Sequence, residues 1–180
     1  VLDMGCGTGI LSIMAAQAGA QSVTGIDIDE WAYNNAMENI ATNNMNNIRV
    51  LIGDATLLDG AEHYDIILAN INRNILLNDM PAYVNVLNDN GYLIMSGFYT
   101  EDIPVIREKA ELLQLTYQSN KVKDNWTAVI FHIKNPGMLQ EISHNRMHRN
   151  ILAETRNSRL QAADTPDNQF YLHTSAGGLI

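Results

Sequence analysis

Hydrophobic residues in the first 134 positions alternate between short continuous runs and longer stretches with helical spacing. The short runs are rich in Val, Ile and Leu and predict strands that are buried on both faces. The first run ends at residue 3, and the others span residues 22–26, 48–52, 64–69 and 92–96. The longer stretches place apolar side chains three or four positions apart and therefore predict helices. They cover residues 9–18, 30–43, 74–87 and 102–113, and Pro81 is a point at which the third helix is expected to bend or divide.

Two further apolar runs, residues 115–123 and 126–133, are joined by Asp124-Asn125. A two-residue connection of this kind is a hairpin turn, so these runs should pair antiparallel. Asn90-Gly91 is read as a separate turn that leads into the fifth strand. Strands that alternate with helices predict an α/β fold, in which helices cover both faces of a mostly parallel, Rossmann-like sheet. The terminal hairpin completes that sheet with an antiparallel pair.

The hydrophobic pattern changes after residue 134, which suggests two segments. Residues 1–134 form the predicted domain, and residues 135–180 form a C-terminal extension without an assigned role. Residues 138–163 are compatible with one polar helix that has a ragged apolar stripe, and residues 164–180 look irregular. Val1 opens the chain inside an apparent strand and without a methionine, so we expect the start of the domain to be truncated.

Charge and cysteine content narrow the range of partners. The net charge is −9, and residues 1–134 carry 16 acidic and seven basic residues. An acidic domain disfavours a phosphate backbone and tolerates a basic protein as partner, so direct nucleic-acid binding is not expected. No run of 18 apolar residues is present, so no membrane span is expected either. The single cysteine fits a reducing, cytoplasmic setting.

The strongest local signal is a glycine turn between the first strand and the first helix, with Asp3, Gly5, Gly7 and Gly9. Glycines let the backbone approach a ligand closely at such a turn. Asp27 ends the next strand, where a carboxylate can accept hydrogen bonds from both ribose hydroxyls of a nucleoside. An NAD site shares this acid, but its fingerprint is G-x-G-x-x-G, whereas the spacing here is G-x-G-x-G. The acidic Asp3 also fits a positively charged ligand better than a pyrophosphate.

These residues resemble the class I S-adenosylmethionine-dependent methyltransferases. The resemblance implies a seven-stranded Rossmann-like sheet and S-adenosyl-L-methionine as cofactor. It implies that Asp3, Gly5 and Gly7 contact the methionine part and that Asp27 binds the ribose. Asp54, after the third strand, matches the family's acidic residue near the adenine. A surface turn residue is the alternative interpretation of Asp54.

Asn70 follows the fourth strand and is the candidate catalytic residue, placed where it can also contact the cofactor. An amide oxygen can accept a hydrogen from an amine and fix its lone pair toward the methyl group. Amino methyltransferases usually have Asn-Pro-Pro-aromatic here, whereas this chain has Asn70-Ile71-Asn72-Arg73. The missing aromatic ring argues against an adenine or glutamine-amide acceptor. A role as helix cap is the alternative interpretation of Asn70.

A narrower resemblance is to the PrmA family of bacterial enzymes, which methylate large-subunit ribosomal protein eleven. Five segments carry it: residues 27–32, Ala36 with Asn39 and Asn43, residues 53–55, residues 69–71 and residues 96–98. This resemblance implies an N-methyltransferase that acts on lysine ε-amines and the terminal α-amine of that protein. Two alternatives stay open, namely a methyltransferase with another acceptor and a cofactor-binding fragment without catalysis.

The remaining candidate residues are interpreted structurally. Cys6 is expected to be a packing residue of the glycine turn, and Trp126 is also expected to pack. Trp31 is read as a packing residue that lies close enough to Asp27 to flank the adenine. No metal spacing is present among the histidines, which are His63, His132, His144, His148 and His173.

Overall fold

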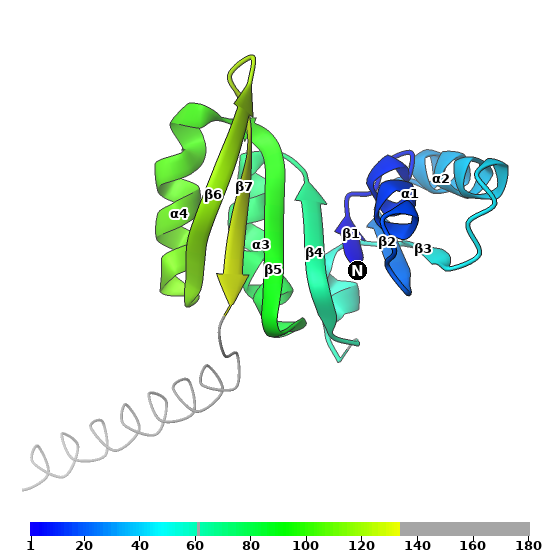
Figure 1. Cartoon of the computed structure of the whole chain (residues 1–180), viewed down its shortest axis with the longest axis horizontal. Helices are drawn as coiled ribbons and strands as arrows, with labels where there is room; N and C mark the ends of the chain where they lie inside the picture. The colour runs from blue at the N-terminus through cyan, green and yellow to red at the C-terminus, as the bar shows by residue number, and fades with distance from the viewer. Residues whose placement is uncertain (61, 134–180) are drawn as a thin grey trace, which may run out of the picture. The chain divides into compact units, whose positions relative to one another are not determined.

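The structure is a computed structural model that describes residues 1–60 and 62–133. The C-terminal extension predicted for residues 135–180 lies outside the described residues. Within the described part, one mixed sheet has the strand order β3-β2-β1-β4-β5-β7-β6 (Figure 1). Its strands are β1 (Leu2–Met4), β2 (Val23–Asp27), β3 (Ile48–Ile52), β4 (Tyr64–Asn70), β5 (Leu87–Tyr99), β6 (Leu115–Lys123) and β7 (Trp126–Ile133).

The first five strands run parallel, and β7 pairs antiparallel with both β5 and β6. Asp124 and Asn125 have φ values of 51° and 67°, which a tight hairpin turn between β6 and β7 requires. The predicted fold, a mostly parallel sheet with an antiparallel hairpin at its end, is confirmed. Parallel strands end at one common edge, so the residues that follow β1, β2, β3 and β4 lie near one another.

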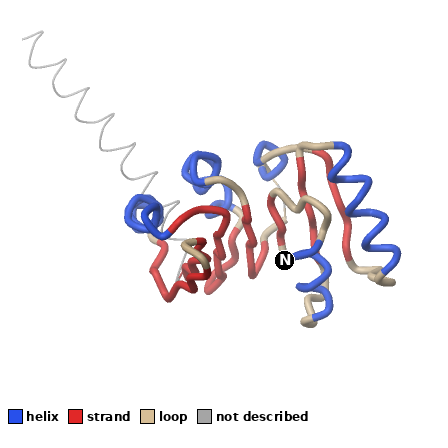
Figure 2. The backbone as a smooth tube through the Cα atoms, turned by 90° about the horizontal axis from the view of Figure 1, so that it is seen from above, coloured by secondary structure: helices blue, strands red, loops and turns tan. Residues whose placement is uncertain are grey.

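Helices cover both faces of the sheet, as the strand–helix alternation predicts (Figure 2). The helices α1 (Ile10–Gln17) and α2 (Glu30–Thr42) pack against strands β1, β2 and β3. On the other face, α3 (Arg73–Asn85) contacts β5, and α4 (Ile103–Leu112) contacts β6. Two short 3₁₀ turns, η1 (Ala55–Leu58) and η2 (Thr100–Asp102), follow β3 and β5. No helix of the described part is long and apolar enough to cross a membrane.

The buried hydrophobic side chains form two separate cores, one covered by α3 and α4 and the other by α1 and α2. The larger core lies under α3 and α4 and includes Leu76, Tyr83, Met95 and Phe131, all fully buried. Full burial of such side chains stabilises a fold by about 1.5–3 kcal/mol each. The smaller core lies between α1, α2 and the first strands, and consists of Cys6, Ile13, Ala36, Ile40 and Val50. Packing of Cys6 in this core confirms its predicted role.

Two sequence predictions about local structure are corrected. Pro81 lies inside α3, which continues from Arg73 to Asn85 without a division. The turn predicted at Asn90-Gly91 lies within β5 and not before it, because Leu87 already pairs with Tyr64 and the ladder resumes only at Tyr92. Asn90 has a φ of 61°, and the residues between Leu87 and Tyr92 interrupt the regular pairing with β4. β5 also continues beyond residue 96, through a second irregularity at Gly97.

Candidate active site

The predicted site residues lie at the carboxyl ends of neighbouring strands. Asp3 lies in β1, Asp27 ends β2, Asn70 ends β4, and Asp54 follows β3. Open α/β sheets bind ligands at this edge, beside the point where the strand order reverses. Here the order reverses between β1 and β4, which are paired neighbours. Met4 pairs with Ala69, so the glycine loop that follows β1 lies level with Asn70.

The glycine loop directs its backbone donors into the protein. The amides of Gly5 and Cys6 donate to the carbonyl oxygen of Ile26 at 2.8 and 3.1 Å. The amide of Gly7 donates to Asp27 Oδ2 at 2.8 Å. Because these donors are already engaged, the loop is a poor clamp for a pyrophosphate, which needs amide hydrogens. This hydrogen bonding argues against the NAD interpretation.

Asp3 is a buried carboxylate with one unsatisfied oxygen. Asp3 is 1% exposed, and its Oδ2 accepts a hydrogen bond of 2.6 Å from Ser12 Oγ. Oδ1 is buried and has no hydrogen-bond partner among the described residues. Burial raises the pKa of Asp3 to about 6, although the hydrogen bond from Ser12 acts in the opposite direction. A cationic ligand group that reached Oδ1 would satisfy the oxygen and stabilise the charged carboxylate.

Asp27 connects the glycine loop to the start of α2. Its Oδ2 accepts from Gly7, and its Oδ1 accepts from the amide of Asp29 at 3.0 Å. Each carboxylate oxygen has a second lone pair, so both can still accept from hydroxyl groups. Ile28 and Trp31, which follow Asp27, are 73% and 67% exposed. The packing role expected for Trp31 is therefore wrong, and its exposed ring leaves an apolar surface beside Asp27.

Asp54 caps the 3₁₀ turn after β3. Its Oδ1 accepts from the amide and the hydroxyl group of Thr56, at 2.9 and 2.6 Å. The hydroxyl and amide hydrogen bonds from Thr56 hold the pKa of Asp54 below its usual value. These contacts support the turn interpretation, yet Oδ2 makes no hydrogen bond with the described residues and can accept one from a ligand.

The spacing of Ala36 and Asn39 has a structural explanation. A Cβ on Gly9 would lie 3.2 Å from Ala36 Cβ, so the start of α1 and the middle of α2 need small residues at their contact. Asn39 Nδ2 donates to the carbonyl oxygen of Thr8 at 2.9 Å. α2 therefore holds the glycine loop in place through one close contact and one hydrogen bond.

The helix cap predicted as an alternative role for Asn70 belongs to Asn72. Asn72 Oδ1 accepts from the amides of Asn74 and Ile75, at 3.1 and 3.2 Å. Asn70 is exposed, and its side chain makes no hydrogen bond with the described residues. Its amide group is therefore available to a ligand at the end of β4, beside the glycine loop.

Ile71 is a site residue that sequence reasoning missed. Its side chain packs over Gly5, where an added Cβ would lie 2.8 Å from Ile71 Cγ1. Its backbone packs over Gly97, where an added Cβ would lie 2.6 Å from the carbonyl oxygen of Ile71. The amide of Ile71 also donates to the carbonyl oxygen of Ser96 at 3.1 Å. Ile71 thus fixes Asn70 between the glycine loop and β5.

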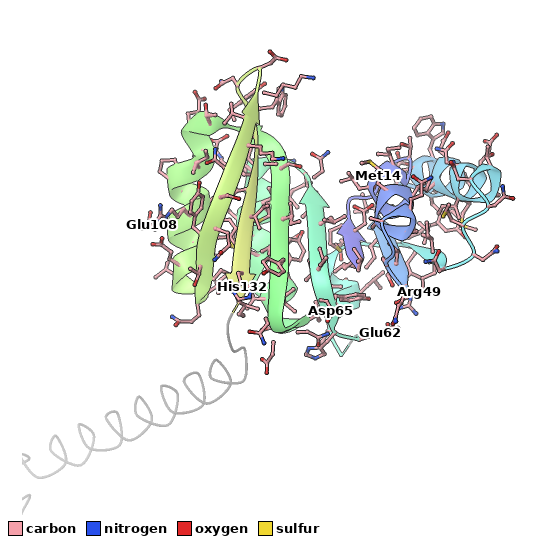
Figure 3. The ribbon with its side chains drawn as sticks, viewed as in Figure 1. Met14, Arg49, Glu62, Asp65, Glu108 and His132 are labelled. Carbon is pink, nitrogen blue, oxygen red and sulfur yellow. The ribbon has the colours of Figure 1, made fainter. Side chains whose placement is uncertain are left out.

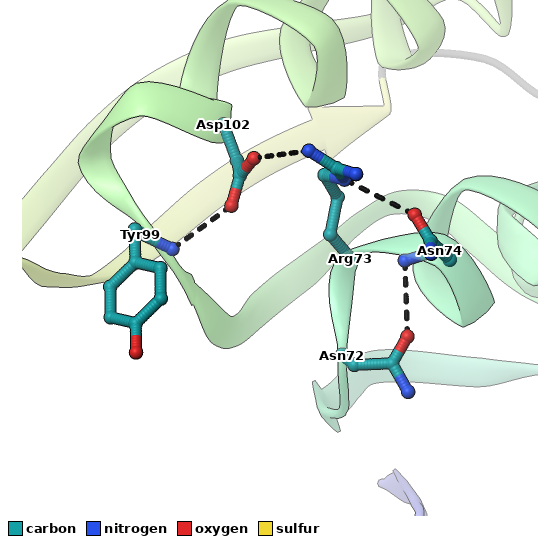
Figure 4. Close-up of polar contacts among 5 residues, drawn as sticks. All are labelled: Asn72, Arg73, Asn74, Tyr99 and Asp102. Atoms are coloured by element: carbon teal, nitrogen blue, oxygen red, sulfur yellow. Dashed lines mark hydrogen bonds and ion pairs between the residues drawn. The ribbon is translucent and has the colours of Figure 1, made fainter.

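An ion pair holds the next loop against the start of α3 (Figure 4). Arg73 Nη1 lies 2.7 Å from Asp102 Oδ1, and Asp102 Oδ2 accepts from the amide of Tyr99 at 3.2 Å. The Arg73 guanidinium holds the pKa of Asp102 below its usual value. The side chain of Asp102 is 12% exposed, which makes this pair more sheltered than Arg107–Glu111, whose side chains are each 52% exposed. The sequence offers no signal for this contact.

The remaining candidate residues lie outside this site. Burial raises the pKa of the Cys6 thiol to about 12, so Cys6 is not a nucleophile at neutral pH. His132 lies near the opposite end of the sheet, where its ring stacks on Tyr92 with centroids 4.7 Å apart (Figure 3). His63 precedes β4, and the other three histidines lie outside the described residues. No group of potential metal ligands occurs among residues 1–60 and 62–133.

Comparison with known proteins identifies the family. A sequence model described as ribosomal protein L11 methyltransferase (PrmA) matches residues 1–134. The chain belongs to this family. The resemblance predicted from the glycine loop, the Asn70-Ile71 segment and the Ser96-Gly97 segment is thereby confirmed.

Named relatives of the PrmA family are about twice as long as the region that matches this chain. The ribosomal protein L11 methyltransferase of Phocaeicola vulgatus is 54% identical over 134 residues, which cover 74% of this chain and 48% of that protein. The relative with the same name from Porphyromonas gingivalis is 54% identical over 136 residues, which cover 76% and 47%. The chain therefore spans about half the length of the curated relatives it matches.

Two solved structures share the fold of this chain. The ribosomal protein L11 methylase of Lactobacillus delbrueckii subsp. bulgaricus aligns with a TM-score of 0.70 and 30% identity, covering 74% of this chain and 69% of that one. A methyltransferase from Pyrococcus furiosus, only 20% identical, aligns with a TM-score of 0.63 and shares the fold.

Proposed function

We propose that this chain carries an S-adenosylmethionine-dependent N-methyltransferase site that acts on lysine and N-terminal amino groups of a large-subunit ribosomal protein. One juxtaposition carries the proposal. Two carboxylates, Asp3 and Asp27, lie at the ends of the adjacent strands β1 and β2. Asn70 lies level with the glycine loop that follows β1, and its side-chain amide makes no hydrogen bond with the described residues.

The residues present fit the proposed cofactor. The unsatisfied Oδ1 of Asp3 suits a cationic amine or sulfonium, and Gly5 and Gly7 add no side chains of their own to the loop. Asp27 would accept from the ribose hydroxyls, with the exposed Ile28 and Trp31 beside the nucleoside. Asp54 would accept from the adenine amino group through Oδ2. When bound, S-adenosylmethionine supplies a methyl group on a positively charged sulfur, which is an activated leaving group.

The protein's contribution is then orientation and exclusion of water. Asn70 Oδ1 accepts one hydrogen of a neutral amine, so the lone pair of the nitrogen points away from the amide. Ile71 fixes Asn70, because its backbone packs over Gly97 and its side chain over Gly5. The described residues place no side chain in hydrogen-bond contact with Asn70 that could act as a base, so we infer that the amine loses its proton to water before transfer.

Charge and family membership support a protein acceptor. The relatives are named for methylation of ribosomal protein L11. The net charge of −9 favours a basic protein and disfavours nucleic acid. A reducing cytoplasm suits the single cysteine and a ribosomal substrate. A second candidate function is cofactor binding without methyl transfer, because the named relatives are about twice as long as the matched region.

Calorimetric titration with S-adenosylhomocysteine tests the cofactor site. We expect micromolar binding to the intact chain and a loss of about tenfold or more in Asp27→Ala, since this variant removes the ribose acceptor and the Gly7 contact together. No binding to the intact chain would contradict the proposal. Adding ribosomal protein L11 and labelled S-adenosylmethionine then separates a methyltransferase from a cofactor-binding fragment, because only the first labels the protein.

A further inference from the structure

Tyr99 and Trp126 form an exposed aromatic pair at the edge of the sheet that carries Asn70. They lie opposite each other on β5 and β7, and their ring centroids are 4.4 Å apart with a 42° tilt. Tyr99 is 41% exposed and Trp126 is 49% exposed, so the packing role expected for Trp126 is only partly fulfilled. Large rings that stay half exposed leave aromatic surface available to a ligand.

The bulge at Gly97 places Tyr99 on the same sheet face as Asn70. Side chains alternate along a strand, so Tyr99 should face away from Ser96, three positions earlier. The register shift between Ser96 and Phe98 adds one residue and resets this alternation. Phe98 is therefore buried in the larger core, whereas Tyr99 turns to the face of Ser96, the residue that pairs with Asn70.

Hydrogen bonds hold both rings on a fixed backbone. The Tyr99 amide donates to Asp102, which Arg73 also contacts. On the other strand, the carbonyl oxygen of Asn125 accepts from the Thr100 amide at 3.0 Å, and the side chains of these two residues are hydrogen-bonded. A subsite fixed in this way loses little conformational entropy when a ligand binds.

The chemistry of the pair favours a cation. The face of an aromatic ring attracts an ammonium group electrostatically, and Trp and Tyr do so most strongly. Residues 1–134 carry 16 acidic and seven basic residues, so the surrounding field also favours positive charge. Arg73, the basic residue nearest to Asn70 in sequence, is neutralised by Asp102. An alkylamine arrives as its ammonium form at neutral pH, because its pKa is about 10.4.

We propose that Tyr99 and Trp126 form a subsite for the alkylammonium group of the acceptor, including its methylated forms. This inference rests on the proposed function for the identity of its ligand. The pair receives the charged group where the carboxyl end of β5 meets the amino end of β7, and Asn70 orients the neutral amine beside the glycine loop. Binding of the charged ammonium group thus uses Tyr99 and Trp126, whereas orientation of the reactive neutral amine uses Asn70.

The probe that tests the subsite is Nα-acetyl-Nε-trimethyllysine amide, compared with its neutral tert-butyl isostere. The full chain is used in a Trp31→Phe background, so that Trp126 is the remaining tryptophan and its fluorescence reports binding. We expect the charged probe to bind about three- to tenfold more tightly than the neutral one. Tyr99→Leu should remove this preference, and Tyr99→Phe, which keeps the ring, should retain it.

The chain offers a matched control in the aromatic pair Tyr92–His132. It joins the same two strands near the other end of the sheet, with the same 42° tilt. Tyr92→Leu should leave the preference for the charged probe unchanged. Equal binding of both probes, or a preference that survives in Tyr99→Leu, would overturn the proposal, since a merely hydrophobic pair does not distinguish a cation from its carbon isostere.

Titration of the chain that keeps Trp31 with S-adenosylhomocysteine separates this inference from the proposed function. Cofactor binding without a preference for the charged probe overturns the subsite and leaves the methyltransferase site standing. A preference for the charged probe without cofactor binding supports the subsite and contradicts the proposed function.

Discussion

The backbone of Ile71 lies directly against Gly97, so close that a Cβ at residue 97 would meet the Ile71 carbonyl oxygen at 2.6 Å. Gly97 also has a φ of 91°, which L side chains rarely adopt. This contact explains why the Asn70-Ile71 and Ser96-Gly97 segments occur together in the sequence. The first needs the second in order to keep the end of β4 beside β5.

Gly97→Ala should therefore damage the acceptor site. We expect a loss of about 2–4 kcal/mol in the free energy of unfolding, from backbone strain together with the clash. Methyl transfer should fall more than cofactor affinity, because Asn70 moves with Ile71. Gly19→Ala is the control, since Gly19 has a φ of 103° but no atom within 4 Å of an added Cβ. Equal losses of stability and activity in both variants would show that the Ile71 contact is unimportant.

Asn70→Ala and Asn72→Ala should have opposite profiles. The first should lower turnover by about tenfold or more, since orientation of the amine is lost, and should leave cofactor affinity nearly unchanged. The second should destabilise the protein by about 1 kcal/mol, because it removes the cap of α3. Steady-state kinetics and urea unfolding measure the two effects. A large loss of cofactor binding in Asn70→Ala would contradict the catalytic role proposed for Asn70.

Asp3→Asn should stabilise the cofactor-free protein and weaken cofactor binding. The pKa of Asp3 is raised to about 6 in the folded state from an ordinary value of 3.8. The folded protein therefore binds the Asp3 proton more tightly than the unfolded chain does. The resulting contribution to the free energy of unfolding is complete below pH 3.8 and is lost as the pH rises through 6. At pH 8, Asn should recover up to about 3 kcal/mol of it. Urea unfolding at pH 5 and pH 8 should show a larger gain at the higher pH, and a pH-independent gain would contradict this assignment.

The Arg73–Asp102 pair should affect the acceptor more than the cofactor. Arg73→Met releases Asp102, which otherwise also holds the amide of Tyr99. We expect the KM for the acceptor to rise about two- to fivefold, with little change in the Kd for S-adenosylhomocysteine. Arg107→Met is the matched control, because it breaks an exposed ion pair within α4. Similar kinetics for the two variants would show that the ion pair at the site has no special role.

The sequence predicts this fold well where the hydrophobic pattern of a strand ends at residues that favour a turn. β3, β6 and β7 match their predicted bounds, since each is an apolar or alternating run with turn residues at its end. The start of β5 is predicted five residues too late, because Asn90-Gly91 interrupts the strand and does not precede it. The position of Asp3, Asp27 and Asn70 at one edge of the sheet could be predicted, because each lies at or near a strand end. Ile71, Asp102 and the Tyr99–Trp126 pair could not, because their contacts depend on the bulge at Gly97 and on the pairing of distant segments.

The extra residue in β5 has a consequence for how this fold diversifies. Phe98 is anchored in the core, whereas Tyr99, its immediate neighbour, is free of the core. Substitutions at residues 99 and 126 should therefore cost the fold little, and under the proposed subsite they would alter acceptor preference. A single deletion beside Gly97 would have the opposite effect, because it would exchange the buried and exposed rings at once. Evolution and protein engineering can thus vary the tip of β5 by substitution, while its length is constrained.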